Sequence, residues 1–276
     1  ARWPQADAAG GLAGGSAAAR AGSLPGSIAS QQWVATPDMP ALCRSLLAGL
    51  TVHTGQTVQS LQRGADGWCV TLAEGGSCGG FDALLLAIPP LQAAALLEQH
   101  QPAWAQQAAT LEMLPDWTLM AISGVLSAST DRPPCATPAA PAARRLPVAP
   151  AEGGPLAMIV RNDSKPGRAT VPGLTHWVAH ASTAWSQAHL ETASDQVQLL
   201  LQQALADWLG EPVPWQYATV HRWRYATLSS GASSTALTHR WDGATRIGVC
   251  GDAWGGGGVQ GAWSSARALC QALLAR

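Results

Sequence analysis

The residues best suited to chemistry lie near the end of the chain, where one carboxylate stands in a glycine-rich turn. An apolar run at 247–250 predicts a buried strand, and small residues at helical spacing from 259 onward predict a helix. Between them, residues 251–258 are mostly glycine and include Asp252. Glycines let the main chain approach a ligand closely, and a helix N-terminus offers unpaired N–H groups to an anion. This order predicts a site for a polyphosphate or a flavin.

The same stretch has a second interpretation. A tight connection between a strand and a helix also uses glycines, and Asp252 would then cap the helix by accepting a hydrogen bond from a backbone N–H group. Spacing alone does not separate a carboxylate that binds a ligand from one that caps a helix.

A second set of reactive side chains falls on predicted strands in the middle of the chain. His180 lies in an alternating stretch at 174–181, and His221, Arg222 and Tyr225 lie in a later one. Histidine can transfer protons, arginine can bind a carboxylate or a phosphate, and tyrosine can stack on a ring system. For each of them the competing interpretation is structural, as a core side chain or a surface charge.

Composition argues against several classes of protein. The chain has 276 residues, a formal net charge of −1 and only 12% charged residues, whereas a nucleic-acid binder needs a basic face. No apolar run approaches the roughly 20 residues that span a membrane. The six cysteines form no CxxC pair and no Cys/His cluster with metal-ligand spacing, so we expect no metal site. Reduced thiols fit a cytoplasmic protein.

Apolar periodicity predicts the elements that must position these residues. Helical spacing is strongest at 194–209, where Gly210 ends the pattern. The continuous apolar run at 81–88 predicts a strand buried on both faces, as in a parallel sheet. Shorter patterns predict helices at 41–50 and 91–98 and strands at 57–62, 68–73, 118–126, 156–161 and 218–226. Residues 131–155 hold seven prolines among alanines, which is typical of a surface insertion.

Six motifs, in this order along the chain, resemble the renalase-like branch of the flavin amine-oxidase superfamily. They are WVATPDM from Trp33, GQTVQSL from Gly55, FDALLLAIP from Phe81, WVAHAS from Trp177, HRWRYA from His221, and GVCGD with VQGAW from Gly248. The resemblance runs from about residue 1 to residue 276. It implies a mixed α/β fold in which an incomplete Rossmann-like FAD-binding domain, of the glutathione-reductase type, is interleaved with a substrate domain built on an antiparallel sheet.

The resemblance also implies domain boundaries and a missing segment. We expect residues 31–98 and 245–276 in the FAD-binding domain, and residues 1–30 and 99–244 in the substrate domain. Complete members open with a strand, a G-x-G-x-x-G turn and a helix. The glycines at 10–15 follow no predicted strand. We therefore expect a truncated chain that lacks roughly ninety residues, including the first βαβ unit and its pyrophosphate cradle.

The resemblance implies that six residues bind FAD, namely Val58, Gly251, Asp252, Val259, Gln260 and Gly261. The carboxylate at 252 is expected to bond the ribityl or pyrophosphate part. The backbone at 259–261 is expected to face the pyrimidine edge of the flavin, and the backbone at 58 to touch the adenosine part. Members usually carry glutamate where this chain has Gln260, and glycine near Ser265.

The implied activity is that of an FAD-dependent oxidoreductase. It would transfer a hydride to the flavin from a small-molecule substrate, an amine or a dihydronicotinamide (NAD(P)H-type) compound, with O2 as acceptor. His180, His221 and Arg222 would serve the substrate, and Tyr225 would join Trp177 and Trp185 in an aromatic wall over the flavin. Two alternatives stay open: a truncated, non-catalytic fragment unable to hold FAD, and a module that binds a phosphate without redox chemistry.

Overall fold

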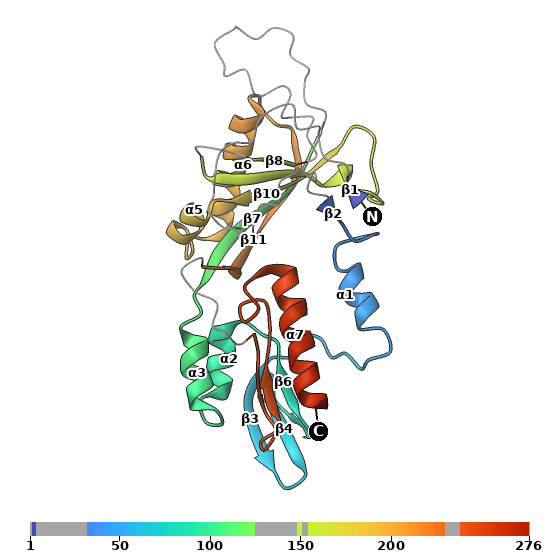
Figure 1. Cartoon of the computed structure of the whole chain (residues 1–276). Coiled ribbons are helices and arrows are strands. Elements are labelled where there is room, and N and C mark those ends of the chain that lie inside the picture. The colour runs from blue at the N-terminus through green and yellow to red at the C-terminus, as the bar shows by residue number, and fades with distance from the viewer. Residues whose placement is uncertain (1, 4–31, 125–147, 151–153, 230–237, 276) are drawn as a thin grey trace, which may run out of the picture. The chain divides into compact units, whose positions relative to one another are not determined.

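The computed structural model describes residues 2–3, 32–124, 148–150, 154–229 and 238–275, and its chain forms two compact units (Figure 1). Unit 1 comprises Ala1–Leu50 and Pro115–Trp223, and unit 2 comprises Thr51–Leu114 and Arg224–Arg276. The domain boundaries expected at 30/31, 98/99 and 244/245, and the role expected of each domain, stay predictions. Most of the insertion expected at 131–155 lies outside the described residues.

Unit 1 is built on a five-stranded sheet with the order β11-β7-β10-β9-β8. Its strands are β7 (Met113–Ser123), β8 (Val148–Pro150), β9 (Leu156–Arg161), β10 (Thr175–Ala181) and β11 (Trp215–Leu228). The pairs β10–β7, β10–β9 and β8–β9 are antiparallel. The strands β7 and β11 begin several residues earlier than the sequence pattern predicted, because their first residues alternate less clearly between apolar and polar types.

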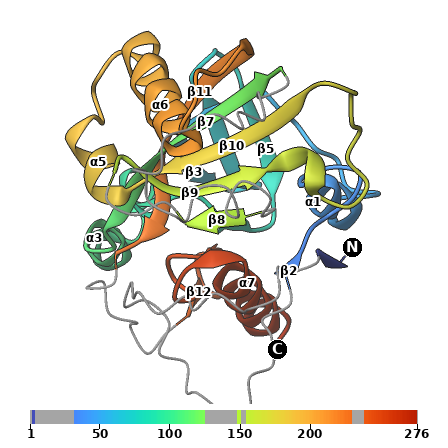
Figure 2. The same cartoon turned by 90° about the horizontal axis from the view of Figure 1, so that it is seen from above.

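Two helices, α5 (Thr183–Ala188) and α6 (Ser194–Leu209), lie on one face of this sheet (Figures 1 and 2). The bounds of α6 confirm the prediction, and Gly210 ends the helix in the left-handed conformation with φ 74°. Side chains at a spacing of four residues form its buried stripe: Val197, Leu201, Leu205 and Leu209. They pack against Trp117 and Leu119 of β7 and Trp177 of β10, which makes the core of unit 1.

The opposite face of the sheet is more open. Val34 packs there with Val160 and Val178. This part of unit 1 also contains the paired strands β1 (Arg2–Trp3) and β2 (Gln32–Trp33), the helix α1 (Ala41–Leu46) and the 3-10 turn η1 (Asn162–Ser164). Helix α1 buries none of its residues and ends four residues earlier than predicted.

Unit 2 contains a three-stranded sheet with the order β12-β13-β6. Its strands are β12 (Arg240–Asp242), β13 (Ile247–Val249) and β6 (Leu84–Leu86), and β13 pairs with β6 in parallel. The parallel pairing agrees with the prediction for 81–88, but burial on both faces does not, because Leu85 is 44% exposed. The helix α7 (Gly258–Leu274) packs Leu269 against the central strand at Gly248 and leaves Leu85 uncovered on the edge strand.

An antiparallel meander and two helices complete unit 2. The meander consists of β3 (Val58–Gly64), β4 (Gly67–Leu72) and β5 (Ser77–Phe81), and the helices are α2 (Pro90–Leu97) and α3 (Pro102–Ala109). Trp68 is 1% exposed and donates its indole N–H to the carbonyl of Thr245, over 2.9 Å. This bond ties the meander to the connection between β12 and β13 and helps to enclose the core of unit 2.

The connection between β12 and β13 depends on one carboxylate. Asp242 accepts hydrogen bonds from Thr245 Oγ1 (2.6 Å), from Gln101 Nε2 (2.7 Å) and from the backbone N–H of Ala244 (2.9 Å). The bonds from Thr245 and Ala244 stabilise the ionised form most and hold the pKa of Asp242 below its ordinary value.

We expect the packing of α6 to make Leu201→Ala strongly destabilising. Leu201 is fully buried, so its truncation should lower the free energy of unfolding by about 2–5 kcal/mol. Leu199→Ala is the matched control, because Leu199 lies on the same helix with 67% exposure and should change stability by less than about 0.5 kcal/mol. Urea unfolding followed by circular dichroism measures both, and equal effects would contradict the packing.

The stability of unit 2 should fall in acid because of Asp242. A carboxyl whose pKa is lower in the folded chain than its unfolded value of about 3.9 stabilises the fold fully above that value. This contribution is lost as the pH falls through the folded pKa. Urea unfolding at pH values from about 5 down to about 2 should show a steeper loss for the native chain than for Asp242→Asn. Parallel pH profiles would show that the carboxylate adds nothing.

Candidate functional site

The predicted strand, glycine turn and helix are present as β13, residues 250–257 and α7. The backbone carbonyl of Asp252 accepts hydrogen bonds from the N–H groups of Gly255 (3.0 Å) and Gly257 (2.7 Å). Gly257 has φ 95° and Gly258 has φ 66°, in the left-handed region that favours glycine. The chain therefore folds back tightly on itself just before the helix begins.

The turn touches the first part of α7 through backbone alone. A Cβ atom at Gly255 would lie 2.0 Å from the carbonyl oxygen of Gly261, and one at Gly261 would lie 2.9 Å from the carbonyl oxygen of Gly255. Neither position has room for a side chain. This contact fixes where the helix N-terminus lies relative to the end of β13.

Ser265 holds the same turn from inside, and the sequence patterns did not single it out as a site residue. Its Oγ atom accepts a hydrogen bond from Gly251 N–H (3.0 Å) and donates one to the carbonyl of Thr238 (2.5 Å). The side chain is fully buried. Its place in the buried stripe of α7, midway between Gly261 and Leu269, is the signal that could have revealed it.

The carboxylate of Asp252 is half-buried and has no hydrogen-bond partner among the residues that the structure describes. The N-cap of α7 is Gly257, and no side chain caps the helix. The interpretation of Asp252 as a capping residue is therefore wrong. The carboxylate is left available for a group that is not part of the described chain.

Backbone donors also open the helix that follows Asp252 in the chain. The N–H groups of Gly258, Val259 and Gln260 open α7, and none of them donates a hydrogen bond to a described residue. Trp254 also buries its indole N–H without a described partner. Together with the partial positive charge of the helix N-terminus, these groups suit an anionic or carbonyl-rich ligand.

Five of the six residues predicted to bind FAD thus share one turn and the start of one helix. The exception is Val58, which lies 38% exposed at the irregular end of β3 in the same unit. Gln260 contacts Ser264 at 3.5 Å, and Val259 is 81% exposed. Whether these six residues contact a cofactor remains a prediction.

The predicted catalytic residues are not gathered in one place. His180 lies in β10 of unit 1, where its Nδ1 atom is 2.7 Å from Oδ2 of Asp116. Tyr225 lies in the part of β11 that belongs to unit 2. Trp177, its expected partner in an aromatic wall, is 3% exposed and donates to Ser123 Oγ, so core packing accounts for it.

Arg222 and His221 are neighbours on β11 and therefore point to opposite faces of the sheet. The Arg222 guanidinium donates to the carbonyl of Leu190 (2.6 Å) and to Glu191 Oε2 (3.2 Å). It also lies 5.4 Å from the ring centre of Trp117. These contacts explain Arg222 structurally, whereas His221 is exposed and touches only the ring of Trp223 in the described chain.

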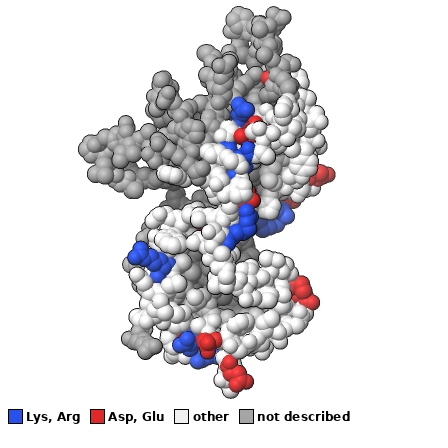
Figure 3. Space-filling model, turned by 90° about the vertical axis from the view of Figure 1, so that its right-hand side faces the viewer, with Lys and Arg blue, Asp and Glu red and all other residues white. Residues whose placement is uncertain are grey.

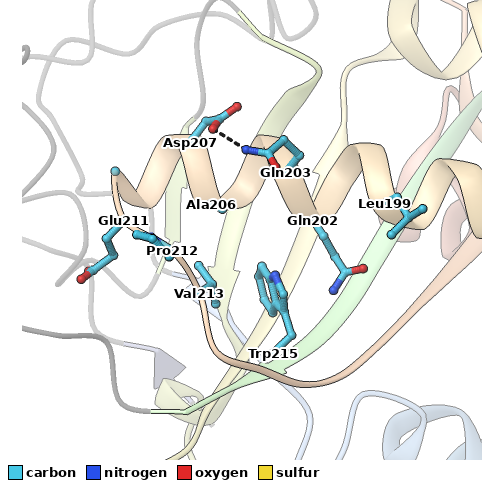
Figure 4. Close-up of a pocket in the computed structure, with 10 residues that line it drawn as sticks. Leu199, Gln202, Gln203, Ala206, Asp207, Glu211, Pro212, Val213 and Trp215 are labelled. Atoms are coloured by element: carbon cyan, nitrogen blue, oxygen red, sulfur yellow. Dashed lines mark hydrogen bonds between the residues drawn. The ribbon is translucent and has the colours of Figure 1, made fainter.

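A groove of about 730 Å³ lies on unit 1. Figure 4 shows its lining residues, which come from the last turns of α6 and the segment that follows it. Gln203 donates to Asp207 over 2.8 Å, and Trp215 is the aromatic residue of the lining. None of the predicted site residues lies in this groove.

Three further findings concern the surface charges, the possible metal ligands and the helices of the described residues. On the face shown in Figure 3, lysine, arginine, aspartate and glutamate atoms are scattered among uncharged ones. No group of three or more His, Cys, Asp or Glu side chains in the described part of the chain could hold a metal ion. No described helix combines the length and the apolar character needed to cross a bilayer.

The chain belongs to the flavin-containing amine oxidoreductase family. The model of that family matches residues 27–274, which include most of both units. Members contain a flavin, and FAD is the cofactor that this membership implies. The glycine turn, the open N–H groups of α7 and the unpartnered Asp252 carboxylate fit one part of such a ligand.

Three solved structures resemble parts of this chain. A protein from Exiguobacterium sp. 255-15 assigned as a protoporphyrinogen oxidase is 15% identical with a TM-score of 0.53, over 79% of this chain and 46% of that one. Cyclohexylamine oxidase from Brevibacterium oxydans IH-35A is 11% identical with a TM-score of 0.47, over 79% and 47%. A variant of putrescine oxidase is 12% identical with a TM-score of 0.48, over 78% and 48%.

The chain thus spans about half the length of these structures. The first likeness indicates a shared fold and nothing about the reaction. The predicted fold class is confirmed: a mixed α/β chain with antiparallel sheets, of the type found in FAD-dependent oxidoreductases.

We expect Gly255→Ala to disrupt the turn. The new methyl group would collide with backbone at Gly261, which cannot move as a flexible side chain could, so stability should fall by about 3 kcal/mol or more. Gly256→Ala is the control: it faces open space at φ 91° and should cost only about 1–2 kcal/mol of conformational strain. Thermal unfolding compares the two, and a silent Gly255→Ala would overturn the close contact.

Proposed function

We propose that this chain forms part of an FAD-dependent amine oxidoreductase, with a renalase-like or amine-oxidase-like reaction. A small-molecule amine, or a dihydronicotinamide compound, would give up a hydride, and O2 would be the final acceptor. The observation that carries the proposal is the family match over 27–274 together with the open donors at the start of α7. Bound FAD supplies a ring system that accepts a hydride.

The residues of unit 2 would act on the cofactor by orientation and charge. Asp252 would accept hydrogen bonds from hydroxyl groups of the ribityl chain or bind beside the pyrophosphate. The N–H groups at Val259 and Gln260, at the positive end of α7, would stabilise negative charge at the edge of the flavin. The close contact between Gly255 and Gly261 would keep these donors in place.

A second candidate is a chain that by itself holds no FAD. In the described residues, β6 is an edge strand of a three-stranded sheet, and Leu85 is exposed there. An unpaired strand edge therefore lies one strand away from β13, the strand that leads into the glycine turn. This feature favours weak or absent cofactor binding in the isolated chain.

Adding FAD to the purified chain tests both candidates. The proposal predicts that the protein keeps flavin absorbance at about 450 nm after desalting. Asp252→Ala should weaken FAD binding by about tenfold, because it removes charge-assisted hydrogen bonds worth roughly 1.4 kcal/mol.

Asp66→Asn is the matched control, since Asp66 is an exposed carboxylate in the β3–β4 turn of the same unit, and it should leave FAD affinity unchanged. A chain that stays colourless with FAD in excess supports the second candidate. Calorimetric titration with FAD and with NAD(P)H then separates a chain that binds neither from a module that binds a nucleotide without redox chemistry.

A further inference from the structure

His180 and Asp116 make the closest contact between a histidine and a carboxylate in the described chain. Nδ1 of His180 is 2.7 Å from Oδ2 of Asp116, and Thr118 Oγ1 lies 3.2 Å from each of these two atoms. His180 lies opposite Thr118 in the β10–β7 pair. Asp116 lies two residues before Thr118 on β7, so its side chain points to the same face of the sheet. The His180 and Asp116 side chains are 31% and 20% exposed, which makes the pair half-buried.

The contact fixes which ring nitrogen carries the proton. An ionised carboxylate only accepts hydrogen bonds, so Nδ1 of His180 must donate to it. In the neutral ring, Nε2 is then a bare proton acceptor. Nε2 has no hydrogen-bond partner among the described residues, and Oδ1 of Asp116 is buried without one. Ordinary core packing leaves few buried polar atoms unpaired in the way that Oδ1 of Asp116 is.

The ring also lies on the open face of the sheet. Ala179 and Ala181, its neighbours along β10, are buried on the face that α5 and α6 cover. Met158, opposite His180 on β9, is 38% exposed. The register between β10 and β9 shifts between His180 and Ala181, and irregularities of this kind re-aim a side chain.

We propose that Asp116 orients His180 so that Nε2 takes a proton from the ammonium form of an amine substrate. The proposal rests on the proposed amine oxidoreductase activity and adds to it a proton acceptor and its positioning residue. The N–H bond of the ammonium group breaks, the proton and its positive charge move to Nε2, and the nitrogen keeps the electron pair. The free amine that results is the form able to lose a hydride. The charge of Asp116 stabilises the imidazolium, and Thr118 donates a hydrogen bond to the Asp116 carboxylate.

The first test needs no flavin and uses the whole chain. Long-range ¹H–¹⁵N NMR on histidine-labelled protein, with His180→Gln to identify the signals, should find neutral His180 protonated at Nδ1. Asp116→Asn should reduce that tautomer, because an amide can also donate to Nδ1. Asp195→Asn, in the exposed first turn of α6, should leave the signals unchanged. Protonation at Nε2 in the native chain would overturn the proposal.

The second test uses the FAD-loaded chain with two amines, one strongly basic and one so weakly basic that it is uncharged at neutral pH. His180→Gln should lower kcat/KM for the basic amine by about a hundredfold, with Asp116→Asn giving a smaller loss. Both variants should be close to native with the uncharged amine. Equal losses for the two amines would show that His180 has another role. If the native loaded chain oxidises neither amine, the proposed function fails, while the NMR result still decides the orientation of His180.

Discussion

The backbone contact between Gly255 and Gly261 is the constraint on which the candidate cofactor site depends. Two main-chain segments meet there with no space for a side chain on either. Because of that contact, the start of α7 lies against the backbone of the turn that carries Asp252. Ser265 secures the same arrangement from the interior through its two hydrogen bonds. The site is therefore made of backbone positions and their supports more than of reactive side chains.

This construction suits chemistry that the cofactor performs. A protein that binds a flavin must supply orientation, a helix end for negative charge and exclusion of competing reactions, and it needs no strong nucleophile of its own. The described residues include no group of three or more side chains that could bind a metal ion, and the predicted catalytic side chains are divided between the two units. Arg222 and Trp177 are explained by contacts within unit 1. The His180–Asp116 pair differs from these, since it leaves a ring nitrogen and a carboxylate oxygen without described partners.

The interactions that stabilise the interior of each unit also differ. Unit 1 depends on a long amphipathic helix whose stripe of leucines and valine covers one face of an antiparallel sheet. Unit 2 has shorter strands, and polar groups join its parts: Trp68 bonds to Thr245, and Gln101 bonds to Asp242. A substitution in unit 1 is thus expected to act through cavity formation, whereas in unit 2 hydrogen bonding and pH matter as well.

The sequence by itself determined the elements whose signal is local. The helix at 194–209 repeats its apolar residues every turn and ends in a glycine, so it was predicted to the residue. The strand, glycine turn and helix at the end of the chain were predicted for the same reason, because glycine is needed where φ is positive.

Only the tertiary structure decided the pairings. In the folded chain Asp116 pairs with His180, 64 residues away in the sequence. The N-cap of α7 is Gly257 and not Asp252, and Leu85 is exposed on an edge strand. Each of these outcomes depends on which segments lie side by side. The periodicity of a single segment carries no information about its neighbours.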